Sequence, residues 1–195
     1  MSNSNRIFYI ARHGETDWNR QGRWQGQTDI PLNDTGRAQA RDLGRRMGAL
    51  GITHVHASDL SRARETAEIV AGELGARFAG AHPGLRERNF GILEGVSREE
   101  MVVRFPDLWH AYHTEGRMMP EGAEPHAHVI DRMHDTALAL VADLGKDETA
   151  VFISHGGAIR VWLSHHTECA IPPIGNAGVF RVELSNNHIV SAEPL

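Results

Sequence analysis

The sequence of 195 residues contains a single cysteine, Cys169, and no apolar stretch long enough to cross a membrane or to act as a secretion signal. One cysteine excludes a disulfide within the chain and fits a reducing compartment. The first five residues are polar, so we expect a soluble cytoplasmic protein. A net charge of −5, spread over interspersed acidic and basic residues, provides no electrostatic basis for binding nucleic acid or an anionic membrane. The sequence also lacks a glycine-rich Walker loop, which argues against a nucleotide site of that type.

The composition is that of an ordinary globular protein, with 41% hydrophobic and 23% charged residues. A chain of this length is long enough for one substantial core and short for two. It contains no repeat, low-complexity tract or linker, so we expect residues 1–195 to form a single domain. The sequence leaves both a monomer and a homodimer open.

Three short apolar runs have the pattern of buried strands, and a helix or a long loop follows each of them: residues 6–11, 52–56 and 149–153. Such connections join parallel strands, whose carboxyl ends then lie at one edge of a sheet. Helices are expected at about 34–50, 58–74, 97–105, 107–115 and 124–145, with another after residue 157. Residues 179–184 and 188–190 have the pattern of a hairpin at the sheet edge. The segment between the second of these helices and residue 96 is predicted to be loop and irregular structure.

Basic and imidazole side chains follow all three predicted strands. Arg12 and His13 come directly after the first strand, the segment from Ser58 to Arg62 follows the second, and His155 follows the third. In open α/β sheets, ligands bind just beyond the carboxyl ends of the strands. Two arginines and two imidazoles suit a tetrahedral dianion, because guanidinium groups bind phosphate oxygens through paired hydrogen bonds. The pattern therefore favours an anion-binding pocket at this edge.

Four motifs carry a more specific signal: Arg12-His13-Gly14-Glu15-Thr16, the segment from Ser58 to Ala63, Glu87 with Phe90-Gly91 and Glu94-Gly95, and Ser154-His155-Gly156-Gly157. Together they resemble the histidine phosphatase superfamily, and more narrowly its branch 1, which includes the cofactor-dependent phosphoglycerate mutases. The resemblance covers nearly the whole chain in the family's order, including Pro31-Leu32 and Asn176-Ala177. It implies an α/β fold of three layers, α/β/α, in which helices flank a mostly parallel central sheet.

The resemblance also implies roles for individual residues. His13 would be the nucleophile that takes the phosphoryl group, and Glu87 the general acid that later activates water as a base. Arg12, Arg62 and His155 would hold the phosphoryl oxygens. Because the two arginines disfavour a protonated imidazole, the pKa of His13 should be lowered. Asn19, Thr28 and Gly156 are further substrate-binding candidates, and Glu15 is expected only to orient the pocket.

Two departures from the mutase pattern favour hydrolysis. Mutases carry an aromatic hydroxyl after the catalytic glutamate, whereas Phe90 stands three residues beyond Glu87 here. They also have an insertion whose lysine and paired arginines hold the substrate carboxylate. In this chain the stretch between Gly95 and Glu121 is short, and its arginines are Arg98, Arg104 and Arg117. Water should then reach the phosphohistidine, so we expect a phosphatase that acts on a small phosphorylated metabolite without a cofactor.

Two alternatives remain open. The first is a cofactor-dependent phosphoglycerate mutase. The second is a non-catalytic relative that binds phosphorylated ligands or another protein, although such a relative would be expected to lose His13 or Glu87, and both are present. The segment 97–122, which should select the substrate, follows no recognisable pattern.

Thirteen histidines also raise the question of a metal site. The candidate groups are His126 and His128 with Glu124, His110 with His113, and His165 with His166. None has a three-ligand spacing supported by cysteine or carboxylate residues, so we expect no metal.

Overall fold

The structure, a computed structural model, describes residues 5–114 and 120–195, except for the side chains of Tyr112 and His113. Arg117, and the predicted end of a helix at residue 115, lie outside the described residues. Within the described part of the chain, no helix is both long and apolar enough to cross a membrane.

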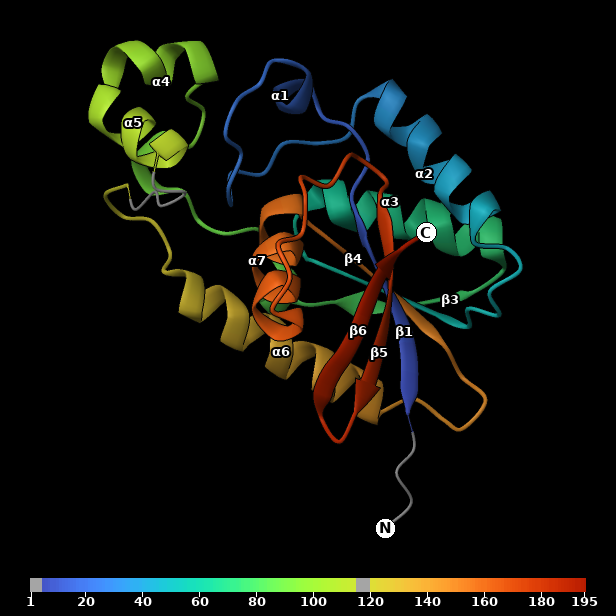
Figure 1. Cartoon of the computed structure of the whole chain (residues 1–195). Helices are drawn as coiled ribbons and strands as arrows, with labels where there is room; N and C mark the ends of the chain where they lie inside the picture. The colour runs from blue at the N-terminus through green and yellow to red at the C-terminus, as the bar shows by residue number, and fades with distance from the viewer. Residues whose placement is uncertain (1–4, 115–119) are drawn as a thin grey trace.

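Within the described residues, six strands form one sheet in the order β3-β2-β4-β1-β5-β6 (Figure 1). They are β1 (Arg6–Arg12), β2 (His54–Ala57), β3 (Arg77–Ala81), β4 (Ala150–Ser154), β5 (Val179–Ser185) and β6 (His188–Pro194). The first four strands are parallel to one another, whereas β5 runs antiparallel to β1 and β6 antiparallel to β5. The expectation of a mostly parallel sheet is therefore confirmed.

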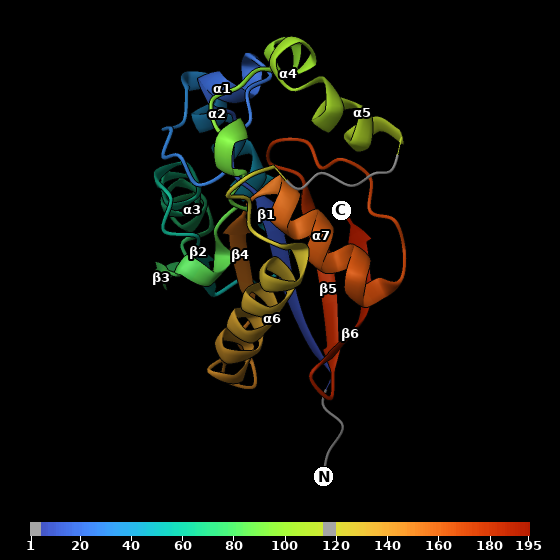
Figure 2. The same ribbon diagram turned by 90° about the vertical axis from the view of Figure 1, so that its left-hand side faces the viewer.

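Helices cover both faces of this sheet (Figures 1 and 2). On one face lie α2 (Asp34–Arg46) and α3 (Ser61–Leu74), and on the other lie α6 (His126–Ala142) and α7 (Gly156–Thr167). Two further helices, α4 (Arg98–Arg104) and α5 (Pro106–Thr114), form a lobe away from the sheet, and α1 (Asp17–Arg20) lies near α4 (Figures 1 and 2). Two 3-10 turns, η1 (Pro83–Leu85) and η2 (Gly91–Leu93), complete the described elements. This is the predicted three-layer α/β/α arrangement.

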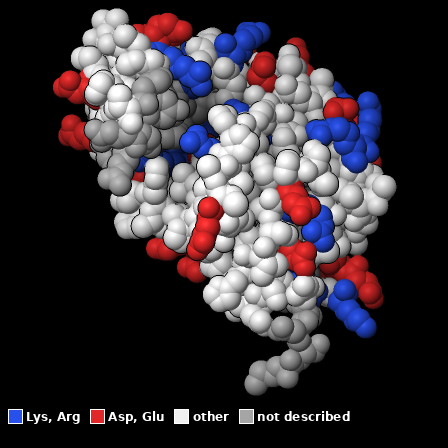
Figure 3. Space-filling view, in the orientation of Figure 1, with Lys and Arg blue, Asp and Glu red and all other residues white. Residues whose placement is uncertain are grey.

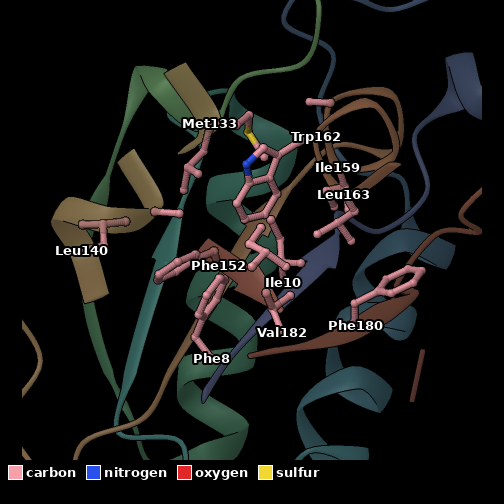
Figure 4. Close-up of a cluster of buried hydrophobic side chains, with 14 of the residues drawn as sticks. Phe8, Ile10, Met133, Leu140, Phe152, Ile159, Trp162, Leu163, Phe180 and Val182 are labelled. Atoms are coloured by element: carbon pink, nitrogen blue, oxygen red, sulfur yellow. The ribbon is translucent and has the colours of Figure 1, made fainter. Parts of the chain in front are cut away.

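Side chains of the central strand β1 alternate between two apolar cores, as the two-residue period of a strand requires. Phe8 and Ile10 face α6 and α7, where they pack in a cluster with Trp162 (Figure 4). Tyr9 and Ala11 face α2 and α3. Because β1 is covered on both faces, the loop that leaves its carboxyl end starts from a fixed point.

Most predicted elements are present with boundaries shifted by a few residues, and the main error lies after α3. The segment predicted to be irregular contains β3, an edge strand whose partner among the described strands is β2, with a register shift between Val55 and His56. Phe78 is its one strongly β-favouring residue, and Gly80 has a φ of 143°. Pairing with the exposed edge of β2, rather than local preference, makes this segment a strand.

A second difference is α1, a single turn within the loop predicted to follow the first strand. Thr16 caps it: its hydroxyl accepts from the Asn19 backbone N–H, while the Asn19 side chain accepts from the Thr16 backbone N–H. This capping box brings the Asn19 side chain back toward the end of β1.

Candidate active site

A cavity of about 360 Å³ opens at the carboxyl end of the parallel strands, where the sequence predicted an anion pocket. Figure 3 shows a hollow between the α4–α5 lobe and the rest of the molecule, with basic side chains at its wall. Among the described residues that line the cavity, the charged ones are Arg12, Arg23, Arg62, Glu87, Arg98 and Arg160. The lining is therefore strongly positive.

His13 lies in this cavity directly after β1, with 3% of its surface exposed. Its Nδ1 is 2.6 Å from the carbonyl oxygen of Gly14. A carbonyl only accepts hydrogen bonds, so Nδ1 carries the proton and Nε2 keeps a free electron pair. Burial, followed by the charges of Arg62 and Arg12, lowers the pKa of His13 well below its usual value, as predicted. The ring is thus a neutral imidazole suited to nucleophilic attack.

Three side chains beside His13 have buried nitrogen atoms with no hydrogen-bond partner among the described residues. They are Arg12 through Nε, Arg62 through Nε, and His155 through both ring nitrogens. The ring of His155 lies 5.1 Å from that of His13, measured between centroids. Leaving a buried donor unpaired costs about 1–3 kcal/mol. A site with several such donors is built to receive a group rich in acceptor oxygens.

Backbone carbonyls hold Nη1 of Arg12 and both Nη atoms of Arg62. Arg12 donates through Nη1 to Ile174, at 2.6 Å. Arg62, which is fully buried, donates through Nη1 to Thr28 at 2.9 Å and through Nη2 to Gly26 at 2.7 Å. Burial lowers the pKa of Arg62 to about 10, so it stays charged at neutral pH. Burial, then the charge of Arg62, also lowers the pKa of His155 well below its usual value, which keeps that ring neutral.

Asn19 also lines the cavity, and its hydrogen bonds determine which end of its amide is free. Its Oδ1 accepts from the Thr16 backbone N–H at 3.1 Å and from Asn176 Nδ2 at 3.2 Å. Its Nδ2 has no partner within the described chain, so the amide presents a donor rather than an acceptor to a ligand. Asn176 lines the cavity as well and also donates to the His13 carbonyl, at 3.1 Å.

Glu87, the one carboxylate among the described cavity residues, is fixed at the start of α7. Its carboxylate accepts from the backbone N–H groups of Arg88 at 2.8 Å, Gly157 at 2.9 Å and Ala158 at 2.7 Å. Its own carbonyl accepts from Arg132 Nη2 at 3.1 Å. A carboxyl group held this firmly beside His13 and the arginines is placed for proton transfer.

Glu94 accepts hydrogen bonds from two loops and so links them. One carboxylate oxygen accepts from the backbone N–H groups of Gln27 at 2.9 Å and Phe90 at 3.1 Å. The other accepts from the backbone N–H of Thr28 at 2.9 Å and from its hydroxyl at 2.6 Å. The loop held in this way supplies both carbonyls that fix Arg62.

The structure brings most of the predicted site residues into one cavity: Arg12, His13, Asn19, Arg62, Glu87 and Gly156 line it. His155 lies beside them, buried against His13. Thr28 is not among the lining residues, and it contributes through its carbonyl and its bond to Glu94. Glu15 also lies apart from the lining, where it accepts from Asn33 at 2.9 Å.

Arg160, Asn176 and Arg98 also line the cavity, although the sequence had not predicted a site role for them. Arg160 follows Gly156 by four positions on α7, so both occupy one helix face. That spacing could have indicated that Arg160 lies on the same side of α7 as the predicted site residue Gly156. Asn176 reaches the cavity only because the loop before β5 folds back beside β1, which no local pattern indicates. No group of three potential metal ligands clusters in the described part of the chain.

Comparisons with known proteins identify the family of this chain. The family model of the histidine phosphatase superfamily (branch 1) matches residues 8–193. Phosphoglycerate mutase-like protein 4 of Arabidopsis thaliana is 37% identical over 157 residues, which cover 77% of this chain and 66% of the relative. The probable phosphoglycerate mutase GpmB of Erwinia tasmaniensis is 39% identical over 159 residues, covering 80% of this chain and 72% of that protein.

Solved structures of other proteins are also similar to this chain over more than nine-tenths of its length. A mycobacterial glucosyl-3-phosphoglycerate phosphatase complexed with VO3 superposes with a TM-score of 0.83 at 27% identity, covering 91% of this chain and 92% of that one. YhfR of Bacillus stearothermophilus superposes with a TM-score of 0.82 at 27% identity, covering 94% and 93% of the two chains. The family match spans almost every described residue, and the chain belongs to branch 1 of the histidine phosphatase superfamily.

Proposed function

We propose that the protein hydrolyses the phosphomonoester of a small metabolite through a phosphohistidine on His13, without a metal ion. The observation that carries this proposal is the set of unpartnered donors of Arg12, Arg62 and His155 around a neutral imidazole. A fourth donor, Asn19 Nδ2, which has no partner within the described chain, completes a clamp for the phosphoryl oxygens. Such a clamp stabilises the charge of the transferring group, which is the main contribution a protein makes to phosphoryl transfer.

In the first step, Nε2 of His13 forms a bond to phosphorus while the bond between phosphorus and the ester oxygen breaks. The leaving oxygen takes a proton from the carboxyl group of Glu87 and departs as an alcohol. In the second step, Glu87 takes a proton from water, whose oxygen attacks phosphorus and displaces Nε2. Inorganic phosphate leaves, and both residues return to their starting states.

The curated relatives with mutase names make phosphoglycerate mutase the second candidate. The two reactions differ in what accepts the phosphoryl group from His13. Purified protein should be incubated with 3-phosphoglycerate and 2,3-bisphosphoglycerate, with free phosphate and 2-phosphoglycerate measured together. Hydrolysis predicts that phosphate release greatly exceeds 2-phosphoglycerate formation. Mutase turnover faster than phosphate release would reverse the ranking.

We also propose that the protein is located in the cytoplasm. The chain has one cysteine, Cys169, which is exposed and free. An exposed thiol fits a reducing compartment, and small phosphorylated metabolites are abundant there. Fractionation of cells expressing the protein, with the thiol state of Cys169 measured by alkylation, tests the location.

A further inference from the structure

The loop that carries Glu87 has no regular secondary structure of its own to hold it. Residues 86–89 form neither helix nor strand, although they directly follow the 3-10 turn η1. General acid catalysis nevertheless requires a donor within about 2.6–3.2 Å of the leaving oxygen. A displacement of about 1 Å can lower the rate by about 10²-fold. The backbone of Glu87 must therefore be held by contacts from elsewhere in the fold.

Arg132 of α6 supplies such contacts to the loop. It donates through Nη1 to the carbonyls of Gly84 at 2.9 Å and Arg86 at 2.7 Å, and through Nη2 to the carbonyl of Glu87 at 3.1 Å. Its Nε and Nη2 also donate to the two carboxylate oxygens of Glu124, at 2.7 Å and 2.9 Å. A guanidinium group has five N–H donors, and Arg132 uses all of them in these bonds.

Glu124 holds the residues that follow Glu87. Its Oε2 accepts from the backbone N–H of Asn89 at 3.3 Å, and its own backbone N–H donates to the Asn89 carbonyl at 2.9 Å. The carbonyl of Glu124 accepts from Arg88 Nε at 2.7 Å. The side chains of Arg132 and Glu124 are only 21% and 16% exposed, so solvent ions screen their paired bonds weakly. Together the two residues fix the loop on both sides of Glu87.

These backbone contacts differ from the bonds to the Glu87 carboxylate itself. The carboxylate accepts from the N–H groups of Gly157 and Ala158, but it must carry a proton when it acts as an acid. A protonated oxygen becomes a donor and loses part of its capacity to accept, so those bonds weaken during the proposed reaction. Backbone carbonyls and a guanidinium group keep their protonation states at neutral pH. The bonds from Arg132 therefore hold the backbone of Glu87 in the same way throughout.

We propose that Arg132, supported by Glu124, is a positioning residue for the general acid Glu87. This inference rests on the proposed hydrolytic function. Arg132 does not belong to the described lining of the cavity, so it acts on the reaction through the loop rather than through the substrate. Its replacement should impair the step that needs a proton donor and leave phosphate binding unchanged.

The variant Arg132→Lys tests this inference, because lysine keeps the charge but carries its donors on one nitrogen and cannot reproduce the planar fork. kcat/KM reports on formation of the phosphohistidine, in which an alkyl leaving group needs a proton and a nitrophenolate does not. We expect kcat/KM for glycerol 3-phosphate to fall roughly 10- to 10²-fold, and that for p-nitrophenyl phosphate to change little. The inhibition constant of inorganic phosphate should also stay the same. Partial loss of folded protein would lower both kcat/KM values equally, so it cannot change their ratio.

Further variants separate positioning from a loss of stability. Glu124→Gln removes the charge and one acceptor that hold Arg132, and it should lower the ratio of alkyl to aryl kcat/KM as well, even if Arg132→Lys does not fold. In Glu87→Gln protein, which has no acid to position, adding Arg132→Lys should lower the ratio no further. Arg45→Lys is the matched control, because Arg45 of α2 pairs with Glu73 of α3 at 3.3 Å, outside the described cavity lining. It should leave both kcat/KM values unchanged.

An unchanged ratio in Arg132→Lys, or equal losses on both esters, would overturn the positioning role. A further fall of the ratio when Arg132→Lys is added to Glu87→Gln would also overturn it. These results leave the hydrolytic function standing, because turnover of the two esters by the wild-type protein is measured independently. Failure of the wild-type protein to hydrolyse either ester would overturn both proposals.

Discussion

Replacing Gly157 with alanine should impair catalysis while leaving the fold intact. Gly157 lies in the first turn of α7, and its backbone N–H donates to Glu87 Oε2 at 2.9 Å. A Cβ added there would lie 2.7 Å from Glu87 Oε1 and 3.1 Å from its Cδ. The first distance is too short for non-bonded atoms, so the Glu87 carboxylate must move away from the helix. Its bonds to Gly157 and Ala158 then weaken.

The magnitude follows from the proposed role of Glu87. General acid catalysis contributes roughly 10²- to 10⁴-fold, so a displaced acid should lower kcat by roughly 10²-fold for alkyl phosphates. A nitrophenolate leaves readily as an anion, so p-nitrophenyl phosphate should lose less than about 10-fold. Alanine is favoured over glycine in a helix by about 1 kcal/mol, and a lost hydrogen bond costs about as much. The free energy of unfolding should therefore change little.

The assay compares kcat for glycerol 3-phosphate with kcat for p-nitrophenyl phosphate, and denaturant unfolding measures stability. Gly72→Ala in α3 is the matched control, because a Cβ there meets no atom within 4 Å. It should stabilise the protein slightly and leave both activities unchanged. Unimpaired hydrolysis of the alkyl ester by Gly157→Ala, or equal losses on both esters, would refute the assignment of Glu87 as the acid.

Four further predictions concern the clamp and the nucleophile. Glu94→Gln replaces an acceptor oxygen with an amide NH₂ group that faces N–H donors, which should loosen the loop whose carbonyls hold Arg62. The inhibition constant of inorganic phosphate should therefore rise by roughly 10-fold. An unchanged inhibition constant would show that Glu94 does not support the phosphate clamp. Arg62→Ala should lower kcat/KM at least about 10²-fold, as for one lost transition-state donor, and a loss below 10-fold would contradict its place in the clamp. Because the pKa of His13 lies well below 6.5, phosphorylation by aryl phosphates should persist below pH 6.5, and a rapid-quench pH profile that halves there would contradict a neutral buried ring. Exhaustive chelation should leave activity intact, and loss that zinc or magnesium restores would contradict a clamp made only of side chains.

Stability should depend on pH through the same buried histidines. In the folded protein the pKa values of His13 and His155 are depressed, whereas unfolded histidines titrate near 6.5. The unfolded state therefore binds more protons as the pH falls, and the free energy of unfolding should decrease below about pH 6.5. Denaturant midpoints between pH 8 and pH 5 check this, and replacement of His155 by a neutral residue should flatten the slope.

The positions of the residues around His13 could be predicted from the sequence, because these residues lie at the ends of recognisable strands. Arg12 and His155 directly follow or end strands whose apolar pattern is plain, and parallel pairing of β1 with β4 brings them together. In contrast, β3 has little strand character of its own and exists through its partner β2.

The outer part of the site depends on how loops fold over one another, and it was correspondingly less predictable. Glu94 acts by accepting hydrogen bonds from Gln27 and Thr28, which lie more than 60 residues away in sequence. Asn176 reaches Asn19 from a separation of 157 residues. Contacts of this kind carry no periodic signal, so only the folded chain identifies them.

The central claim is that His13 carries the phosphoryl group, and trapping the intermediate tests it most directly. Protein mixed with a radiolabelled aryl phosphate and quenched within milliseconds should hold phosphate that is labile in acid and stable in base, as a phosphohistidine is. The same label should be absent from His13→Ala and should accumulate in Glu87→Gln, in which water is no longer activated. Label in His13→Ala equal to that of the wild-type protein would place the nucleophile on another residue.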